Sequence, residues 1–160
     1  MYNYAEQYWD NYNDDYRAQG NDCTNFISQI MKVGGREDDL GIWNSDENWW
    51  YNWINQTHSW AGAHNWAVFA RINSQRVSHI PNVYEMLVTD VLQVEWDHPD
   101  EGDEPNNIDH TMILTGRLGP AGAAEEIYLT YHASDRWNVA FWGWLLPQGK
   151  DRDAWYAHRT

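Results

Sequence analysis

The chain has 160 residues, of which 42% are hydrophobic, and this is enough for one domain with a buried core. Its net charge of -14 argues against nucleic acid and anionic membrane surfaces as partners, because their negative charges would repel the chain. The single cysteine excludes an intramolecular disulfide and any metal site built from several cysteines. No apolar run has the length of a membrane span, and no segment resembles a signal peptide.

The first quarter of the chain predicts two helices. Tyrosines recur at every fourth position from Tyr4 to Tyr16, which predicts an amphipathic helix that ends before Gly20. A second helix is predicted further on, and the glycine pair 34–35 is typical of the position just past its C-terminus. Its apolar residues at helical spacing are Phe26, Ile27, Ile30, Met31 and Val33.

The only cysteine lies at the predicted start of this second helix, with Asn21 or Asp22 as the N-cap. Unpaired N–H groups and the helix dipole favour an anion there, so we expect the pKa of the Cys23 thiol to be lowered. Together with histidines elsewhere in the chain, this position is typical of a cysteine nucleophile. The alternative is a buried cysteine that only packs, which is a common role of free cysteine.

The middle of the chain predicts a loop, a helix, strand character and a second loop. Ser59 is a suitable N-cap for a helix from Trp60 to about Ser74, and residues 86–96 have strand character. The turn-forming residues of 36–58 predict an ordered loop that either walls a cleft or covers the core. Its tryptophans are Trp43, Trp49, Trp50 and Trp53.

Residues 97–109 form an acidic segment with proline and glycine, which predicts an exposed loop. Asp97, Asp100 and Asp103 offer the oxygen ligands that calcium prefers, but their spacing does not match an EF-hand loop. A solvated charged loop is the preferred interpretation, and no metal is predicted.

The last third of the chain predicts a β-hairpin from His110–Thr115 and Glu126–His132, followed by a short strand at residues 141–146. If the turn centres near Ala121, His110 lies opposite His132, and the two side chains are close enough to touch. A base held by an orienting partner needs this arrangement. A register slip of one residue would turn one of the two rings to the other face. Asp135 is the alternative orienting group.

Three blocks of the sequence together resemble a known family, the putative bacterial amidase domain of the papain-like cysteine hydrolase superfamily, whose relatives include NlpC/P60 and CHAP domains. The first block spans residues 8–29 and ends in NDCTNFISQ; the second is Ser59-Trp60 with the helix that follows. The third, within residues 90–136, contains DHTMILT and YLTYHASD. The resemblance implies a single domain, residues 1–160, with a papain-like α+β fold. In that fold the cysteine lies at a helix N-terminus and the helix packs on an antiparallel sheet.

The resemblance also implies roles for individual residues. Cys23 is the nucleophile, His110 is the general base and then the acid, and His132 or Asp135 is the third member. The backbone N–H of Cys23 would form part of the oxyanion hole. The side chains expected to complete the oxyanion hole or to bind substrate are Tyr16, Gln19, Asn21 and Asp22.

The implied reaction is acyl transfer, in which the thiolate attacks an amide carbonyl and water then hydrolyses the thioester. It requires no metal and no organic cofactor. The implied protein is a monomeric amidase, secreted or associated with the cell wall, whose leader is absent from this chain and whose substrate is peptidoglycan or a related peptide. Two alternatives remain open. One is a secreted toxin-type domain that deamidates or cleaves a protein, for which an immunity protein or inhibitor is expected. The other is a non-catalytic, aromatic-rich module that binds wall or peptide.

Overall fold

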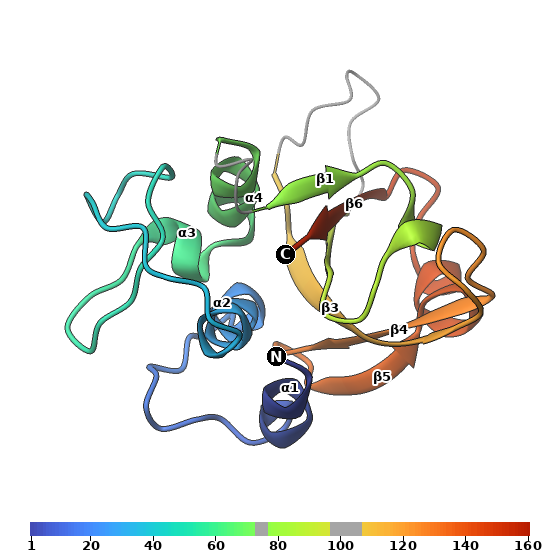
Figure 1. The fold of residues 1–160 in the computed structure, drawn as a ribbon, viewed down its shortest axis with the longest axis horizontal. Coiled ribbons are helices and arrows are strands. Elements are labelled where there is room, and N and C mark those ends of the chain that lie inside the picture. Colours follow the sequence, from blue (N-terminus) through green and yellow to red (C-terminus); the bar gives the residue numbers. More distant parts are fainter. Residues whose placement is uncertain (73–76, 97–106) are drawn as a thin grey trace.

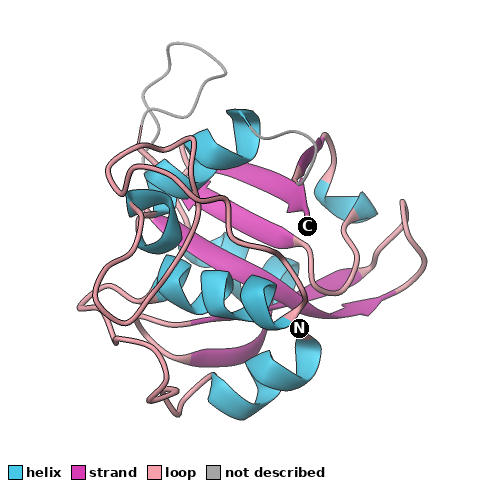
Figure 2. Cartoon of the chain, turned by 60° about the vertical axis from the view of Figure 1, so that its left-hand side comes forward, coloured by secondary structure: helices cyan, strands magenta, loops and turns pink. Residues whose placement is uncertain are grey.

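Helices gather on one side of a curved antiparallel sheet (Figure 1). The computed structural model describes residues 1–72, 77–96 and 107–160. Most of the predicted acidic loop, with the calcium alternative at Asp97, Asp100 and Asp103, lies outside the described residues. Every strand pairing in the described sheet is antiparallel, so the expected α+β class is confirmed. Figure 2 shows helices lying in front of the strands.

The N-terminal helix is shorter than predicted, because α1 ends at Tyr8 and residues 9–22 follow as turns and loop. Asn13 explains part of the difference: its Oδ1 accepts the backbone N–H of Asp15 and its Nδ2 donates to the Tyr4 hydroxyl. Side chains that bond the backbone locally compete with helical hydrogen bonds. The described α-helices are α1 (Tyr2–Tyr8), α2 (Cys23–Val33), α3 (His58–Ala61) and α4 (Ala63–Ile72).

The helix predicted after Ser59 is split in two. Gly62 has an extended backbone, with φ -100° and ψ 129°, and separates α3 from α4. The predicted end near Ser74 lies outside the described residues. None of the described helices has the length and apolar character needed to cross a membrane.

The sheet has the order β1-β6-β2-β3-β4-β5. Its strands are β1 (Ser78–Ile80), β2 (Val91–Glu95), β3 (His110–Leu118), β4 (Glu126–Tyr131), β5 (Arg136–Ala140) and β6 (Ala154–Arg159). Three short helical turns lie between strands: η1 (Val83–Glu85), η2 (Phe141–Leu145) and η3 (Leu146–Gln148).

The strand predicted at residues 141–146 is wrong, because this segment forms the π-helical turn η2 and the start of η3. The Glu126 carboxylate accepts the backbone N–H groups of Trp142 and Gly143, at 2.9 and 2.8 Å. These contacts satisfy donors that a strand would have paired in the sheet.

The alternating side chains of the strands give the sheet two buried faces. One face carries Val91 and Ile113 against the helices. The other carries Met112 and Leu114 in a second core, together with Phe141 of η2. Residues one apart on β3 therefore belong to different cores.

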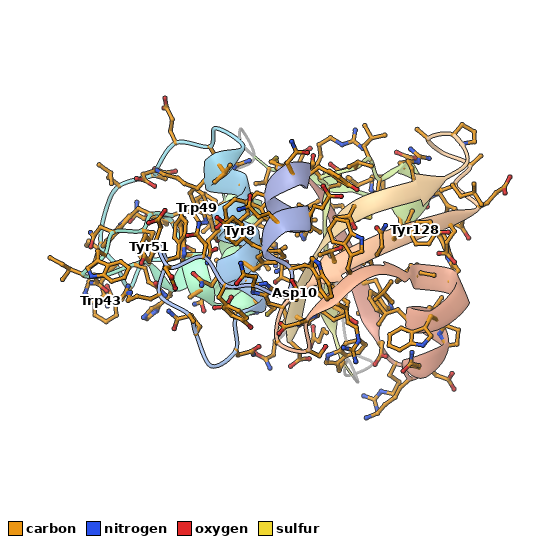
Figure 3. The ribbon with its side chains drawn as sticks, turned by 90° about the horizontal axis from the view of Figure 1, so that it is seen from below. Tyr8, Asp10, Trp43, Trp49, Tyr51 and Tyr128 are labelled. Carbon is orange, nitrogen blue, oxygen red and sulfur yellow. The ribbon has the colours of Figure 1, made fainter. Side chains whose placement is uncertain are left out.

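The tryptophan-rich loop covers the first core with part of its length. Trp49 is buried against Trp60, with ring centroids 4.7 Å apart, and its indole N–H donates to the Ser28 hydroxyl. Trp43 and Trp53 are exposed. Figure 3 shows Trp49 on the inner side of the loop and Trp43 at its outer end.

Candidate active site

Cys23 is the first residue of α2 and its side chain is 2% exposed. The Thr24 hydroxyl lies 3.7 Å from its sulfur, and the backbone N–H groups of Thr24 and Thr111 also donate to it. The ladder between β3 and β4 begins at Ile113, so the Thr111 backbone lies beyond it. The thiol therefore sits against the β3 backbone, one residue from His110.

Burial raises the pKa of the Cys23 thiol, and the charge of Asp22 acts in the same direction. The hydrogen bonds from Thr24 and Thr111 lower it, but they do not outweigh the loss of solvent. The expected lowering by the helix N-terminus is therefore wrong for this state of the molecule. A thiol, rather than a thiolate, occupies the site at neutral pH.

His110 begins β3 and shares its face of the sheet with Met112 and Leu114. Its ring meets the Tyr131 ring edge-to-face, with centroids 4.9 Å apart. Burial lowers the pKa of His110 to about 4, so the imidazole is neutral at pH 7. His110 lines a pocket of about 270 Å³ whose other lining residues are Trp96, Met112, Tyr131, Ala133, Ser134 and Leu145.

The predicted pairing of His110 with His132 is wrong. Leu118 pairs with Glu126 near the turn, and a bulge between Leu114 and Gly116 then shifts the register by one residue. The same register continued past Ile113 and Thr130 would place Thr111, and not His110, opposite His132. The two rings consequently face opposite sides of the sheet.

His132 instead lies on the helical side, where it is fully buried. Its Nδ1 is 2.7 Å from Asp22 Oδ2, and its Nε2 is 2.7 Å from the carbonyl oxygen of Tyr8. The carbonyl only accepts hydrogen bonds, so Nε2 carries a hydrogen and donates to Tyr8, while Nδ1 meets the Asp22 carboxylate. The rings of Phe26 and Tyr12 lie on it, with centroids at 3.8 and 4.4 Å. His132 thus joins the C-terminal end of α1 to the N-cap of α2.

Asp135 is not in direct contact with His132. Its carboxylate accepts the Tyr12 hydroxyl at 3.2 Å, and Tyr12 in turn covers the imidazole. Burial, reinforced by the charges of Asp135 and Asp22, raises the pKa of Tyr12 to about 12. Asp135 therefore reaches the imidazole only through a tyrosine that stays protonated.

The upstream candidates have different surroundings. Asp22 Oδ1 accepts the backbone N–H of Gln19 at 2.7 Å and the side-chain amide of Asn25 at 2.8 Å. The Tyr16 ring packs on Tyr51 and on Trp60, whose indole N–H donates to Asn25. Asn21 is exposed. Asp22 and Gln19 are thus held in the turn before Cys23, and they organise its backbone.

The putative amidase domain family matches residues 1–157, which is nearly the whole chain. The chain belongs to this family. The amidase domain is also 30% identical over 117 residues to the uncharacterized protein YhbB of Bacillus subtilis (strain 168). That similarity covers 71% of the chain but 35% of YhbB, so the chain spans about a third of the relative's length. No solved structure matches the amidase domain. Family membership indicates a hydrolase of the amidase type.

Three further residues of the amidase domain contact the site and were missed from sequence. The Thr24 and Thr111 hydroxyls are 2.9 Å apart, and the Gln93 amide nitrogen is 3.0 Å from the Thr111 hydroxyl. Their sequence position could have identified the two threonines, because Thr24 follows Cys23 and Thr111 follows His110 on a strand. Among the described residues, no group of three or more histidine, cysteine or acidic side chains is placed to hold a metal ion.

We expect iodoacetamide to alkylate Cys23 slowly at pH 7, with the rate rising only above the free-thiol pKa of about 8.5. The reason is that burial raises the pKa of this thiol. Because the chain has one cysteine, the mass of the adduct reports on Cys23 alone. His110→Asn should change the pH profile little, since His110 is neutral at these pH values. Rapid labelling well below pH 8.5 would contradict the raised pKa.

Proposed function

We propose that the amidase domain hydrolyses amide bonds through a thioester on Cys23, with His110 as general base and acid. The observation that carries the proposal is the position of the thiol, in the first turn of α2 and hydrogen-bonded to the β3 backbone beside His110. Membership in the amidase family supports amide hydrolysis as the reaction. The papain-like relationship is part of this proposal.

The charge states suggest how the pair would act. With Cys23 a thiol and His110 a neutral imidazole, the base would take the sulfur proton as the sulfur attacks the carbonyl carbon. In the structure the His110 ring lies on the face of β3 that carries Met112 and Leu114, so the proposal requires the ring to reach the sulfur around the start of the strand. The same ring would then return the proton to the leaving amine. The backbone N–H of Cys23, at the positive end of α2, would stabilise the oxyanion.

The proposed substrate is peptidoglycan or a related peptide. The pocket beside His110 is lined by aromatic and apolar side chains and by Ser134, and none of its lining residues is charged at neutral pH. Such a pocket favours an uncharged group next to the scissile bond. The net charge of -14 disfavours anionic substrates. We propose that a monomer acts outside the cell or at the wall.

A second candidate function is a non-catalytic module that binds wall or peptide. The burial of Cys23 and the raised pKa of its thiol favour this alternative, since both reduce its reactivity. The exposed rings of Trp43 and Trp53 would then supply part of the binding surface.

Incubation with peptidoglycan and with synthetic wall peptides tests the proposal by the release of new amino groups. Cys23→Ser is expected to lower kcat/KM at least about a thousandfold, because an oxygen nucleophile replaces the sulfur. The acid limb of kcat/KM in the wild type is expected near pH 4, where His110 becomes charged. A thioester trapped by acid quenching should add the acyl mass to the wild type and not to the variant.

The exposed His58 offers a control, and His58→Asn should leave the activity unchanged. Full activity in Cys23→Ser would exclude Cys23 as the nucleophile. Wall binding that is equal in wild type and Cys23→Ala, with no turnover of wall or protein substrates, would establish the binding module instead.

A further inference from the structure

We propose that Thr24, Thr111 and Gln93 are positioning residues for Cys23, because they form a one-way chain of hydrogen bonds that ends on its sulfur. This inference deepens the proposed function and rests on Cys23 as the nucleophile. The three side chains come from α2, β3 and β2, so the chain of hydrogen bonds runs through the packing of the helix on the sheet.

The chain of hydrogen bonds starts at a backbone carbonyl. Gln93 Nε2 is 2.9 Å from the carbonyl oxygen of Ala63 and 3.0 Å from Thr111 Oγ1. Thr111 Oγ1 is 2.9 Å from Thr24 Oγ1, which is 3.7 Å from the sulfur of Cys23. Gln93, Thr111 and Thr24 are each 0% exposed, so water does not compete for these contacts.

The direction of the chain follows from the valence of each group. The carbonyl of Ala63 only accepts, so the atom of Gln93 that meets it is the NH₂ group, and that group also donates to Thr111. The single hydroxyl hydrogen of Thr111 is then left to donate to Thr24. The single hydroxyl hydrogen of Thr24 is left for the sulfur. In the reverse direction the Thr111 hydrogen would have no acceptor among the contacts of the described residues.

This orientation of the Gln93 side chain costs free energy, because it leaves the amide oxygen unpaired. Its Oε1 is buried, and the described residues offer it no hydrogen-bond partner. A buried polar atom left unpaired is uncommon in folded proteins, and an apolar side chain of similar size would avoid the cost. In return, the amide group of Gln93 is fixed as a hydrogen-bond donor to Thr111.

The consequence is a fixed donor at the sulfur. A hydrogen bond to a charged acceptor is stronger than one to a neutral acceptor, so the Thr24 hydroxyl stabilises the thiolate more than the thiol. The charge that acts on the sulfur is that of Asp22, which opposes the thiolate and whose carboxylate lies 2.7 Å from His132 Nδ1; His110 is neutral. The chain of hydrogen bonds thus offsets part of the burial of Cys23 and holds its side chain against β3.

The test is the rate of Cys23 alkylation by iodoacetamide as a function of pH, measured by adduct mass on the full chain. Thr24→Val keeps the shape and removes the hydroxyl. It should raise the apparent pKa of the thiol by about one unit and slow alkylation about tenfold at pH values below that pKa. Thr24→Ser should restore the wild-type profile. Thr111→Val should shift the profile in the same direction by less, because the Thr24 hydroxyl loses its own donor.

Thr130→Val is the matched control. It breaks a comparable buried contact on the same face of the sheet, the 2.7 Å hydrogen bond between the Thr115 and Thr130 hydroxyls, and should leave the alkylation profile unchanged. In denaturant, every variant should react at one rate. The proposal is overturned if Thr24→Val keeps the wild-type profile, if Thr24→Ser does not restore it, or if Thr130→Val shifts it equally.

This readout uses no substrate, so it separates the two proposals. An unchanged profile in Thr24→Val and Thr111→Val would remove the positioning role and leave amide hydrolysis as it stands. A shifted profile in a protein that turns over no amide would support the positioning role and count against the proposed function alone.

Discussion

Lowering the pH from 6.5 to 4.5 is expected to reduce the free energy of unfolding by about 4 kcal/mol through two buried neutral histidines. Burial, with a smaller contribution from His79, lowers the pKa of His158 to about 3, and burial lowers that of His110 to about 4. Both rings have a pKa near 6.5 in the unfolded chain. Between pH 6.5 and about 4 the unfolded chain therefore binds more protons, so stability falls as the pH falls.

His158 is the better residue for the measurement, because it lies on β6 away from the proposed chemistry. Its ring packs edge-on against Trp66, and its Nε2 has no hydrogen-bond partner in the described part of the chain. His158→Leu should therefore cost little at pH 7 and should remove about half of the loss between pH 6.5 and 4.5. Urea unfolding at pH 7, 6.5 and 4.5 gives the cost of the substitution and the loss of stability on acidification.

The exposed His58 provides the control for this experiment, and His58→Asn should keep the wild-type dependence on pH. Carboxylates that titrate over the same range act equally in all three proteins, so the difference between variants reports on the histidine. Equal losses of stability in wild type and His158→Leu would mean that His158 is protonated in the native state.

Asp22→Ala is expected to destabilise the domain by about 3–5 kcal/mol, because it removes one partner of the fully buried 2.7 Å pair between Asp22 and His132. The substitution also removes the acceptor for the backbone N–H of Gln19 and for the Asn25 amide. Chemical denaturation at pH 7 measures the loss. The double variant Asp22→Ala/His132→Gln should recover part of it, because the buried ring that lost its partner is then gone.

Asp135→Ala is the matched control for the ion pair. Asp135 contacts the same cluster through the Tyr12 hydroxyl, but this hydrogen bond is exposed, so its loss should cost less than about 1 kcal/mol. A cost of less than about 1 kcal/mol for Asp22→Ala as well would show that the ion pair adds little to stability. If the losses of stability of the two single variants add in Asp22→Ala/His132→Gln, the two side chains are not coupled.

Features set by neighbouring residues could be predicted from the sequence. The apolar spacing from Phe26 to Val33 and the glycines after it describe α2, and the hairpin strands near His110 and Glu126 are β3 and β4. Helix periodicity, caps and alternating strands depend on a few consecutive residues. The predictions of these parts of the fold were correct for that reason.

Features set by distant residues could not be predicted. The bulge after Leu114 decides which face His110 occupies, and no local pattern marks it. The partner of His132 is Asp22, which lies 110 residues earlier in the chain. The segment after Phe141 has the composition of a strand, but the Glu126 carboxylate holds its backbone N–H groups in a turn. In each case a tertiary contact overrides the local preference.

The ion pair between Asp22 and His132 also bears on the order in which the chain folds. It closes a loop of 110 residues, and the contact of His132 with the Tyr8 carbonyl spans 124. Closing such loops costs entropy before any contact repays it. On a ribosome, residues 8–22 are synthesised before β4, yet their contacts with His132 cannot form until β4 has been synthesised. The contacts of Tyr8 and Asp22 with His132 are therefore among the last of the fold to form.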